Sequence, residues 1–259
     1  LWVDEEQVAA NVSLAEAIEI VQQGFAAQAR GEVSILERSH VSWQGGSLHA
    51  LGAVSAPSGF AGTRTWAATA AGTTPLLVLF DSETGALRCI VEACALGQLC
   101  AAAVSAIATR WLAAPDAADL ALIGSGHQAF AQVAAIAHVR RLRRVRVFSP
   151  NPAHRKALVA QLHSELVRDA VEAASLGEAL DGAPLVTLAT RATAPFLEAG
   201  MLAPGAHVNA IGAITPERAE LSRDVLESAE RVAVDDLPAA RRLSREFTDF
   251  YGTADESWQ

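Results

Sequence analysis

Three small residues with a fixed spacing form the most distinctive chemical motif of the sequence. Gly124, Gly126 and Ala129 follow the pattern G-x-G-x-x-A, with His127 and Gln128 between the last two. The first glycine permits a tight turn, the second lets a pyrophosphate approach the backbone, and the small third residue lets a helix pack closely on a strand. The N-terminus of that helix would face the phosphates. We therefore predict a nicotinamide-dinucleotide site at these residues; a glycine-rich turn of another α/β fold is the alternative.

The elements around this motif alternate between apolar strands and amphipathic helices after Asp116. Strands are expected at Leu120–Gly124, Val145–Phe148, Ala170–Ala173, Leu185–Ala189, His207–Gly212 and Arg231–Val234, and the first helices at about Gln128–His138 and Pro152–His163. Apolar strands separated by helices predict a parallel sheet that is covered on both faces. The motif lies between the first strand and the first helix, which is the context that a dinucleotide-binding turn requires.

The segment after the second strand is where such a domain reads the adenine ribose. A carboxylate at this place would bind the 2′-hydroxyl of NAD. The sequence instead has Ser149, Pro150 and Asn151, followed by Arg155 and Lys156. Without an acid to repel it, a 2′-phosphate could be held by Ser149, Asn151 and Arg155, so the sequence favours NADP(H) over NAD(H). An exposed helix face is the alternative interpretation of the two basic residues.

The first part of the chain has a different pattern. Ser13 and Glu16 form a capping box that begins an amphipathic helix, and Gly31 is placed to end it. Short strand-like runs separated by glycine-containing turns predict a meandering antiparallel sheet. The expected strands are Ser39–Trp43, Ser47–Val54, Gly62–Trp66, Leu76–Phe80 and Leu87–Val91, and a long alanine-rich helix follows at about Glu92–Leu112.

Composition limits the partners of the protein. The chain has 259 residues, 51% of them hydrophobic, and a formal net charge of −9. An acidic surface repels phosphate backbones, so we expect no nucleic-acid partner. The most apolar stretch, Ala93–Ala114, is interrupted by polar residues, and its alanine content suits a packed helix better than lipid. We therefore expect no membrane partner.

Three cysteines, Cys89, Cys94 and Cys100, lie within one apolar stretch. None has the two-residue spacing of a zinc knuckle, and an odd number does not suit a disulfide framework. We therefore expect buried, reduced thiols, no metal site, and a reducing, cytoplasmic setting.

Several stretches together resemble the ornithine cyclodeaminase / μ-crystallin family in order and spacing. They are Leu79–Gly85, Ala101–Thr109, Ile123–Ala129 and Pro204–Gly212. The resemblance implies an α/β protein in which residues 116–246 form a Rossmann-type dinucleotide-binding domain. A smaller α+β domain for substrate binding and dimerisation would comprise residues 1–115 and the tail at about 247–259. The resemblance also implies a homodimer.

The family chemistry is hydride exchange between nicotinamide C4 and the α-carbon of an amino or imino acid. Arg38 matches the family's first carboxylate-binding arginine, and Arg64 occupies the position of the family's lysine. A guanidinium suits a carboxylate well, but it stays protonated and can hardly shuttle a proton. Thr74, or its neighbour Thr73, is a further candidate for a hydrogen bond to substrate.

On the cofactor side, the resemblance places Ala189 and Thr190 against the nicotinamide ribose. A plain turn between strand and loop is the alternative for this pair. Ile211, within the Pro204–Gly212 stretch, is also assigned to the cofactor site.

Two further positions depart from the family pattern. Cys100 replaces the second carboxylate-binding arginine, and Ile214 stands where cyclodeaminases carry their catalytic aspartate. Isoleucine does no acid–base work, which argues against strict ornithine cyclodeamination. Reduction requires fewer catalytic groups from the protein, because an iminium whose nitrogen is already protonated needs only hydride. We therefore expect an NAD(P)H-dependent reductase or dehydrogenase of a small imino or amino acid, of the ketimine or pyrroline-carboxylate type. The alternative is a catalytically impaired protein that binds the cofactor and a small carboxylate.

Overall fold

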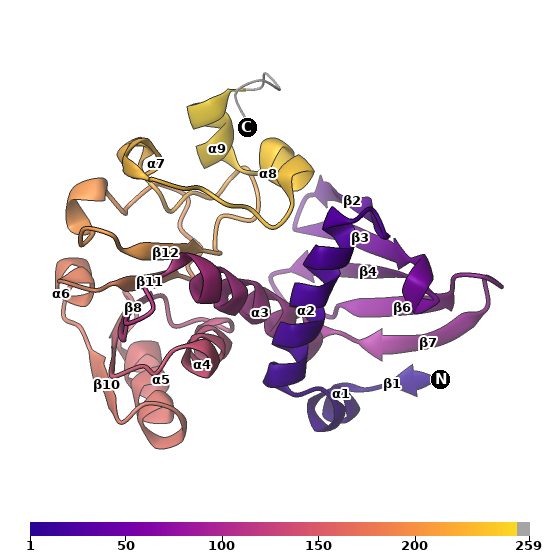
Figure 1. Ribbon diagram of the computed structural model, residues 1–259, viewed down its shortest axis with the longest axis horizontal. Helices are drawn as coiled ribbons and strands as arrows, with labels where there is room; N and C mark the ends of the chain where they lie inside the picture. Colours follow the sequence, from indigo (N-terminus) through magenta and orange to yellow (C-terminus); the bar gives the residue numbers. More distant parts are fainter. Residues whose placement is uncertain (253–259) are drawn as a thin grey trace. The chain divides into compact units, whose positions relative to one another are not determined.

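The computed structural model describes residues 1–252 of the chain (Figure 1). Its internal contacts define two compact units, the first from Leu1 to Ala103 and the second beginning at Val104. The division falls inside helix α3 (Cys94–Leu112), whereas the sequence placed it after residue 115. Because α3 is one continuous helix whose two halves belong to different units, no change in sequence pattern marks the border.

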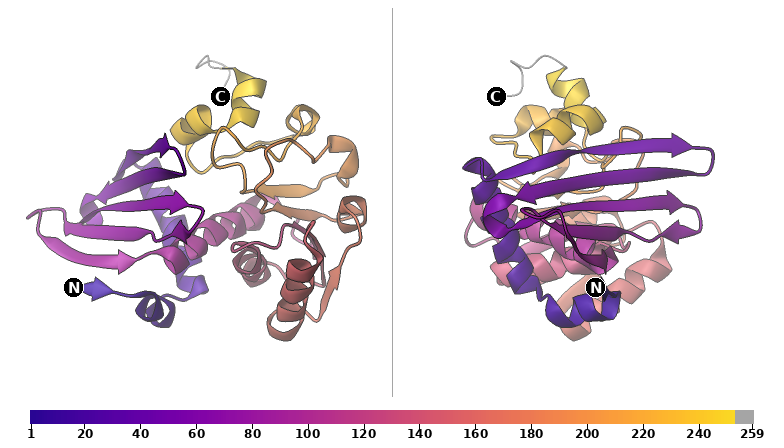
Figure 2. Two further views of the ribbon diagram at one scale, coloured as in Figure 1. Left: turned by 180° about the vertical axis from the view of Figure 1, so that it is seen from behind. Right: turned by 90° about the vertical axis from the view of Figure 1, so that its right-hand side faces the viewer.

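The first unit is built on a sheet with the strand order β1-β7-β6-β4-β3-β2, in which β5 also pairs with β4. The strands are β1 (Trp2–Val3), β2 (Val33–Trp43), β3 (Gly46–Ser55), β4 (Phe60–Thr69), β5 (Gly72–Thr73), β6 (Leu76–Asp81) and β7 (Leu87–Glu92). All pairs are antiparallel except β1 with β7. The predicted antiparallel meander is therefore confirmed, and Figure 2 shows its long strands from two further sides.

The helices of the first unit begin at capping boxes. Helix α1 (Glu5–Asn11) has Asp4 as its N-cap, and α2 (Leu14–Ala29) has Ser13. The Ser13 hydroxyl accepts a hydrogen bond from the Glu16 backbone N–H at 3.2 Å, and the Glu16 carboxylate accepts one from the Ser13 N–H at 3.0 Å. A short 3₁₀ turn, η1 (Ala56–Ser58), links β3 to β4. The predicted capping box of α2 is confirmed.

The second unit contains a parallel sheet with the strand order β10-β9-β8-β11-β12. The strands are β8 (Asp119–Ile123), β9 (Arg144–Phe148), β10 (Asp169–Glu172), β11 (Leu185–Leu188) and β12 (His207–Ala210). The direction of chain progression reverses at β8, because β9 and β11 lie on its two sides. In open α/β sheets, ligands bind beyond the carboxyl ends of the strands at such a reversal. This place is the turn that follows Ile123.

Helices cover both faces of this parallel sheet. On one face lie α4 (Ala129–Val139) and α5 (Pro152–Glu165), and on the other α6 (Leu176–Leu180) and α7 (Arg223–Ser228). The remaining elements of this unit are the 3₁₀ turn η2 (Ala199–Met201) and the helices α8 (Leu237–Leu243) and α9 (Arg245–Tyr251). Within β8, Leu120 and Leu122 belong to one buried cluster, and Ala121 and Ile123 to the other. Burial on both faces explains why this strand is apolar throughout rather than alternating.

Two expectations about the last quarter of the chain need correction. The strand predicted at Arg231–Val234 is not formed, although Val232 packs against the core. Alternating apolar residues indicate an extended segment, but a strand also needs a neighbouring strand to pair with, and the pattern does not show whether one is present. The tail from residue 247 was expected to complete the first domain. Its described part lies in α9, where Phe247 and Phe250 pack against the core of the second unit; residues 253–259 lie outside the described residues.

Helix α3 is long and apolar enough to cross a membrane by length and composition alone. Core helices of soluble proteins pass the same test, and the alanine content of α3 suits close helix packing. A single helix of this kind is weak evidence for a membrane span, and the absence of a membrane partner stays a prediction.

The C-terminal end of α3 is held by Arg140. Its Nη2 donates to the carbonyl oxygens of Thr109, Arg110 and Ala113 at 2.9, 3.1 and 3.2 Å. Carbonyl groups in the last turn of a helix lack partners within the helix, so this guanidinium acts as a C-terminal cap.

Replacing Arg140 by alanine is expected to lower the free energy of unfolding by about 1–3 kcal/mol, because three carbonyl groups lose a charged donor. Chemical denaturation would measure the change, with Arg141→Ala as the control, since Arg141 is exposed. Equal stability of the two variants would show that the cap does not stabilise the helix end.

Candidate functional site

The turn after β8 requires glycine at its first position for two reasons. Gly124 has a φ of +117°, which residues with a side chain rarely adopt. A Cβ on Gly124 would also collide with the carbonyl group of Ala189, whose carbon would lie 2.9 Å away. The two segments are tied together further by a hydrogen bond from the Ala189 N–H to the Ile123 carbonyl oxygen at 2.8 Å. The tight turn predicted at Gly124 is therefore present between β8 and α4.

The rest of the motif leaves room for a phosphate group. No heavy atom lies within 4 Å of the position that a Cβ on Gly126 would occupy. Ala129 is fully buried at the start of α4, as close packing of helix and strand demands. No side chain caps the N-terminus of α4. The helix therefore presents backbone N–H groups to an anion, and the residues fit the pyrophosphate of a dinucleotide.

The two residues between Gly126 and Ala129 differ in exposure. His127 is exposed, whereas Gln128 is half-buried. The side-chain oxygen Oε1 of Gln128 is buried and has no hydrogen-bond partner in the described part of the chain. A buried acceptor without a donor beside the cradle is the kind of group that a bound cofactor would satisfy.

At the end of β9, two of the polar residues assigned to the adenosine phosphate already have local roles. The Ser149 hydroxyl accepts a hydrogen bond from the Ser125 hydroxyl at 2.8 Å. Asn151 is the N-cap of α5, and its side-chain oxygen accepts from the N–H groups of Ala153 and His154, both at 3.1 Å. Both residues lie at the predicted place, but each already has a hydrogen-bond partner within the chain.

Arg155 also lies at this end of the sheet. Its Nη1 donates to the Ser149 carbonyl oxygen at 2.9 Å, and its Nε donates to the Glu172 carboxylate at 2.9 Å. Its side chain is only 16% exposed. The structure thus brings Arg155 beside Ser149, as the sequence predicted. It also adds a carboxylate, Glu172 at the end of β10, that the sequence did not reveal.

On the other side of β8, the segments after β11 and β12 are joined by one residue. The carboxylate of Glu220 accepts hydrogen bonds from the N–H and hydroxyl of Thr190 and from the N–H of Gly212. Ile211, one residue earlier, is half-buried and donates its N–H to the Leu188 carbonyl oxygen at 3.0 Å. Sequence reasoning found Thr190 and Ile211 but missed Glu220, because nothing distinguishes it locally from other acidic residues.

In the first unit, the side chain of Arg64 on β4 is fixed on several sides. Its Nη2 donates to the Ala93 carbonyl oxygen at 3.1 Å, and its guanidinium lies 5.0 Å from the centroid of the Trp66 indole. A Cβ on Gly97 of α3 would collide with the guanidinium, so glycine makes room for it. Burial lowers the pKa of Arg64, and the nearby Cys100 thiol opposes this shift. Arginine stays protonated in such surroundings.

A second arginine approaches the same indole. The guanidinium of Arg38 on β2 lies 5.8 Å from the centroid of Trp66. The ring of His49 on β3 stacks on Trp66 at 4.9 Å and on His40 at 5.7 Å, in register across the three strands. The structure therefore brings the two predicted carboxylate-binding arginines to one aromatic ring. Trp66 was missed, although the two-residue spacing from Arg64 puts both side chains on one face of the strand.

The remaining candidates lie in less constrained places. Thr74 is exposed in the connection between β5 and β6, so its role stays a prediction. Ile214 is 43% exposed in the turn after Gly212. The expectation of buried cysteines was wrong: all three are free thiols, but Cys89 and Cys94 are half-buried and Cys100 is exposed. The apolar character of α3 does not translate into full burial along its length.

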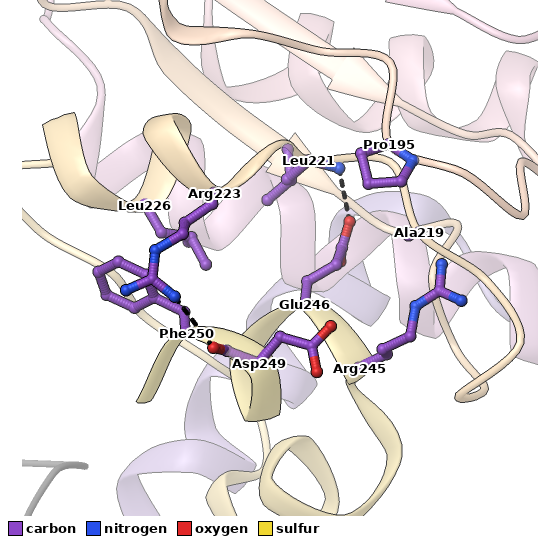
Figure 3. A pocket seen from close by; sticks show the side chains of 9 residues that line it. All are labelled: Pro195, Ala219, Leu221, Arg223, Leu226, Arg245, Glu246, Asp249 and Phe250. Atoms are coloured by element: carbon purple, nitrogen blue, oxygen red, sulfur yellow. Dashed lines mark hydrogen bonds between the residues drawn. The ribbon is translucent and has the colours of Figure 1, made fainter. Parts of the chain in front are cut away.

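A small hollow of about 140 Å³ lies elsewhere on the second unit (Figure 3). It is lined by Pro195, Ala219, Leu221, Arg223, Leu226, Arg245, Glu246, Asp249 and Phe250. Sites for drug-sized ligands measure about 300–1,000 Å³, and none of the residues assigned to the cofactor lines this hollow. It is therefore not the dinucleotide site.

A parallel sheet that reverses its order at β8, with the glycine turn at the reversal, defines a Rossmann-type dinucleotide-binding protein that carries a second, α+β unit. The chain belongs to the ornithine cyclodeaminase/mu-crystallin family, whose sequence model matches residues 3–245. The family resemblance and the fold class inferred from the sequence are both confirmed.

Relatives and a solved structure support this assignment. An alanine dehydrogenase of Archaeoglobus fulgidus is 26% identical over 93% of this chain and 75% of that protein. The ketimine reductase mu-crystallin of Rattus norvegicus is 30% identical over 65% of this chain and 52% of that protein. An archaeal alanine dehydrogenase dimer with bound NAD matches with a TM-score of 0.88 at 25% identity, over 93% of this chain and 76% of that chain. The present chain thus spans about half the length of the mu-crystallin relative.

Proposed function

We propose that the protein is a nicotinamide-dependent reductase or dehydrogenase of a small imino or amino acid, of the ketimine or pyrroline-carboxylate type. The observation that carries this proposal is the complete dinucleotide turn at Gly124–Ala129, in a chain of this family. The names of the relatives point the same way, because they include a ketimine reductase and an alanine dehydrogenase.

The residues of this chain divide the chemistry as follows. Arg64 and Arg38 would bind the substrate carboxylate, since a guanidinium forms two parallel hydrogen bonds with it. Trp66 would keep both guanidinium groups in place. When bound, a reduced nicotinamide supplies the hydride. Ile214 offers no acid or base, which suits reduction of an imine that is already protonated better than expulsion of ammonia from ornithine.

We further propose that NADP(H) is preferred over NAD(H). Arg155 stands beside Ser149 at the end of β9, and no carboxylate follows that strand directly. Glu172 opposes the preference, because its carboxylate neutralises Arg155 and would lie close to a 2′-phosphate.

Replacing Glu172 by glutamine is therefore expected to strengthen NADPH binding about three- to tenfold while NADH binding changes less than twofold, since about 1 kcal/mol of charge repulsion is removed. Titration of nicotinamide fluorescence would give both dissociation constants. Glu165→Gln, an exposed site at the end of α5, is the matched control. If the dissociation constants of NADPH and NADH change by the same factor, Arg155 and Glu172 do not contact the 2′ position of the cofactor.

We also propose that the protein acts as a homodimer through its first unit. Large apolar side chains are exposed on one face of β2 and β3, where the strand register brings together Leu36, Val41, Trp43, Leu48 and Val54. Exposed apolar residues gathered in this way often mark a protein interface. The archaeal alanine dehydrogenase is a dimer. Free cysteines agree with the reducing, cytoplasmic setting that we also propose.

A turnover assay tests the proposed function. The protein is mixed with NADPH or NADH and with cyclic ketimines, pyrroline carboxylates, or 2-oxo acids with amines, and the absorbance of the reduced nicotinamide is followed. The proposal expects loss of this absorbance with at least one of these compounds. Tight cofactor binding without any turnover would instead favour a binding protein that has lost catalysis, and failure to bind either cofactor would overturn the assignment of the glycine turn.

A further inference from the structure

Glu220 is a fully buried carboxylate whose two oxygens accept hydrogen bonds from two different loops. Its Oε1 accepts from the Thr190 N–H at 2.9 Å and from the Thr190 hydroxyl at 2.6 Å. Its Oε2 accepts from the Gly212 N–H at 2.8 Å. Burying a carboxylate costs free energy unless it is hydrogen-bonded in this way. Removing the charge of Glu220 would therefore weaken the hydrogen bonds of all three donors.

The two loops that Glu220 joins follow β11 and β12. Parallel strands end at the same edge of the sheet, and Thr190 and Gly212 come directly after these ends. A Cβ on Gly212 would collide with the carboxylate of Glu220 and with the carbonyl oxygen of Thr190. The absence of a side chain at Gly212 is therefore what allows Glu220 to reach both loops.

The Thr190 segment also touches the dinucleotide turn. Ala189, its neighbour, packs its carbonyl group against Gly124 and donates its N–H to Ile123. The backbone at positions 189 and 190 is therefore held on one side by the turn and on the other by Glu220. A shift of this backbone would move the Thr190 loop while the glycine turn at Gly124–Ala129 keeps its conformation.

Glu220 is itself anchored from α9. The Glu246 carboxylate accepts hydrogen bonds from the backbone N–H groups of Glu220 and Leu221, both at 2.5 Å, and Figure 3 shows the bond to Leu221. The carbonyl oxygen of Glu220 accepts from the N–H groups of Phe196 and Leu197 at 3.1 and 3.0 Å. Because two segments, α9 and Phe196–Leu197, fix its backbone, Glu220 has little freedom to move with the loops, and the loops must adapt to it.

We infer that Glu220 is the positioning residue of the nicotinamide half of the cofactor site, which it sets by holding Thr190 and Gly212. The inference rests on the proposed function, since it assigns a task within the same site. It separates two halves of the cofactor: the glycine turn binds the pyrophosphate, and the loops that Glu220 holds orient the ring that carries the hydride.

The test compares Glu220→Gln with the wild type. Glutamine has the same shape, but its NH₂ group replaces one acceptor and would face an N–H donor. We expect about a tenfold or larger loss of affinity for NADPH or NADH, because a hydrogen bond to a charged group is removed and a donor is left buried. Affinity for ADP, which keeps the pyrophosphate but lacks the nicotinamide and its ribose, should stay within about twofold. Glu217→Gln is the control, because Glu217 is exposed in the same segment.

Two variants of Thr190 keep the test decisive if Glu220→Gln folds poorly. Thr190→Val removes the hydroxyl and should reproduce part of the loss, whereas Thr190→Ser keeps the hydroxyl and should lose less affinity than Thr190→Val. Equal losses for dinucleotide and ADP, or no loss for either, would overturn the inference. If wild-type protein binds neither dinucleotide, the proposed function fails first. If it binds them and Glu220→Gln and Thr190→Val bind like wild type, only the role of Glu220 fails.

Discussion

Replacing Gly124 by alanine is expected to weaken dinucleotide binding by at least about a hundredfold, which corresponds to about 3 kcal/mol. A side chain at this position meets two obstacles, the backbone φ of +117° and the carbonyl group of Ala189. An unfavourable φ of this kind costs about 1–3 kcal/mol by itself. The turn would have to move away from the end of β11, and it would carry the N-terminus of α4 with it. Isothermal titration with NADH and NADPH measures the loss.

Gly126→Ala is the informative comparison for this prediction. The Cβ position at Gly126 is open, so alanine there should change the free energy of unfolding by less than about 0.5 kcal/mol. It should nevertheless weaken dinucleotide binding about tenfold or more, because the methyl group occupies the approach of the pyrophosphate. Gly124→Ala should lower both stability and binding. If Gly126→Ala binds the cofactor like wild type, the pyrophosphate does not lie on this turn.

Replacing Arg64 by alanine is expected to raise the KM for an imino-acid substrate about a hundredfold while the affinity for the cofactor stays within about twofold. The guanidinium would supply two charge-assisted hydrogen bonds to the carboxylate, each stronger than a neutral bond. Its contacts with Ala93 and Trp66 hold it in one orientation, so little ordering is needed when substrate binds. Steady-state kinetics with each substrate varied in turn separates the two effects.

The variant Arg64→Lys sharpens this prediction, because lysine is the residue that the family resemblance places here. It keeps the positive charge but loses the planar fork, so an intermediate KM is expected. Arg88→Ala is the control, since Arg88 lies on β7 of the same sheet with a side chain that is 56% exposed. A KM for Arg64→Ala equal to that of wild type would remove Arg64 from the substrate site.

The parts of the structure that the sequence predicts well are local. The strand, glycine turn and helix from Asp119 to Val139 depend on neighbouring residues and on steric rules, and they form as expected. The capping box at Ser13 is equally local and equally correct. By contrast, the strand expected at Arg231–Val234 would have needed a distant partner, and an alternating pattern cannot show whether such a partner exists.

The same distinction applies to the candidate site. Glu220 joins Thr190 and Gly212 across 30 and 8 positions of sequence, and Glu172 pairs with Arg155 across 17. These contacts exist only once the sheet has assembled, so no local pattern distinguishes these acids from exposed ones. Asn151 shows the converse: its type suited a phosphate ligand, but in the structure its side-chain oxygen caps α5.

The transfer of one labelled hydride tests the central proposal most directly. The protein is incubated with NADPH or NADH carrying deuterium at the reactive C4 position and with a cyclic ketimine such as pyrroline-2-carboxylate, and the product is examined by mass spectrometry. The proposed function predicts a cyclic amino acid with one deuterium on its α-carbon. Consumption of the cofactor without deuterium in the product, or no cyclic amino acid from any member of the ketimine class with either cofactor, would contradict it.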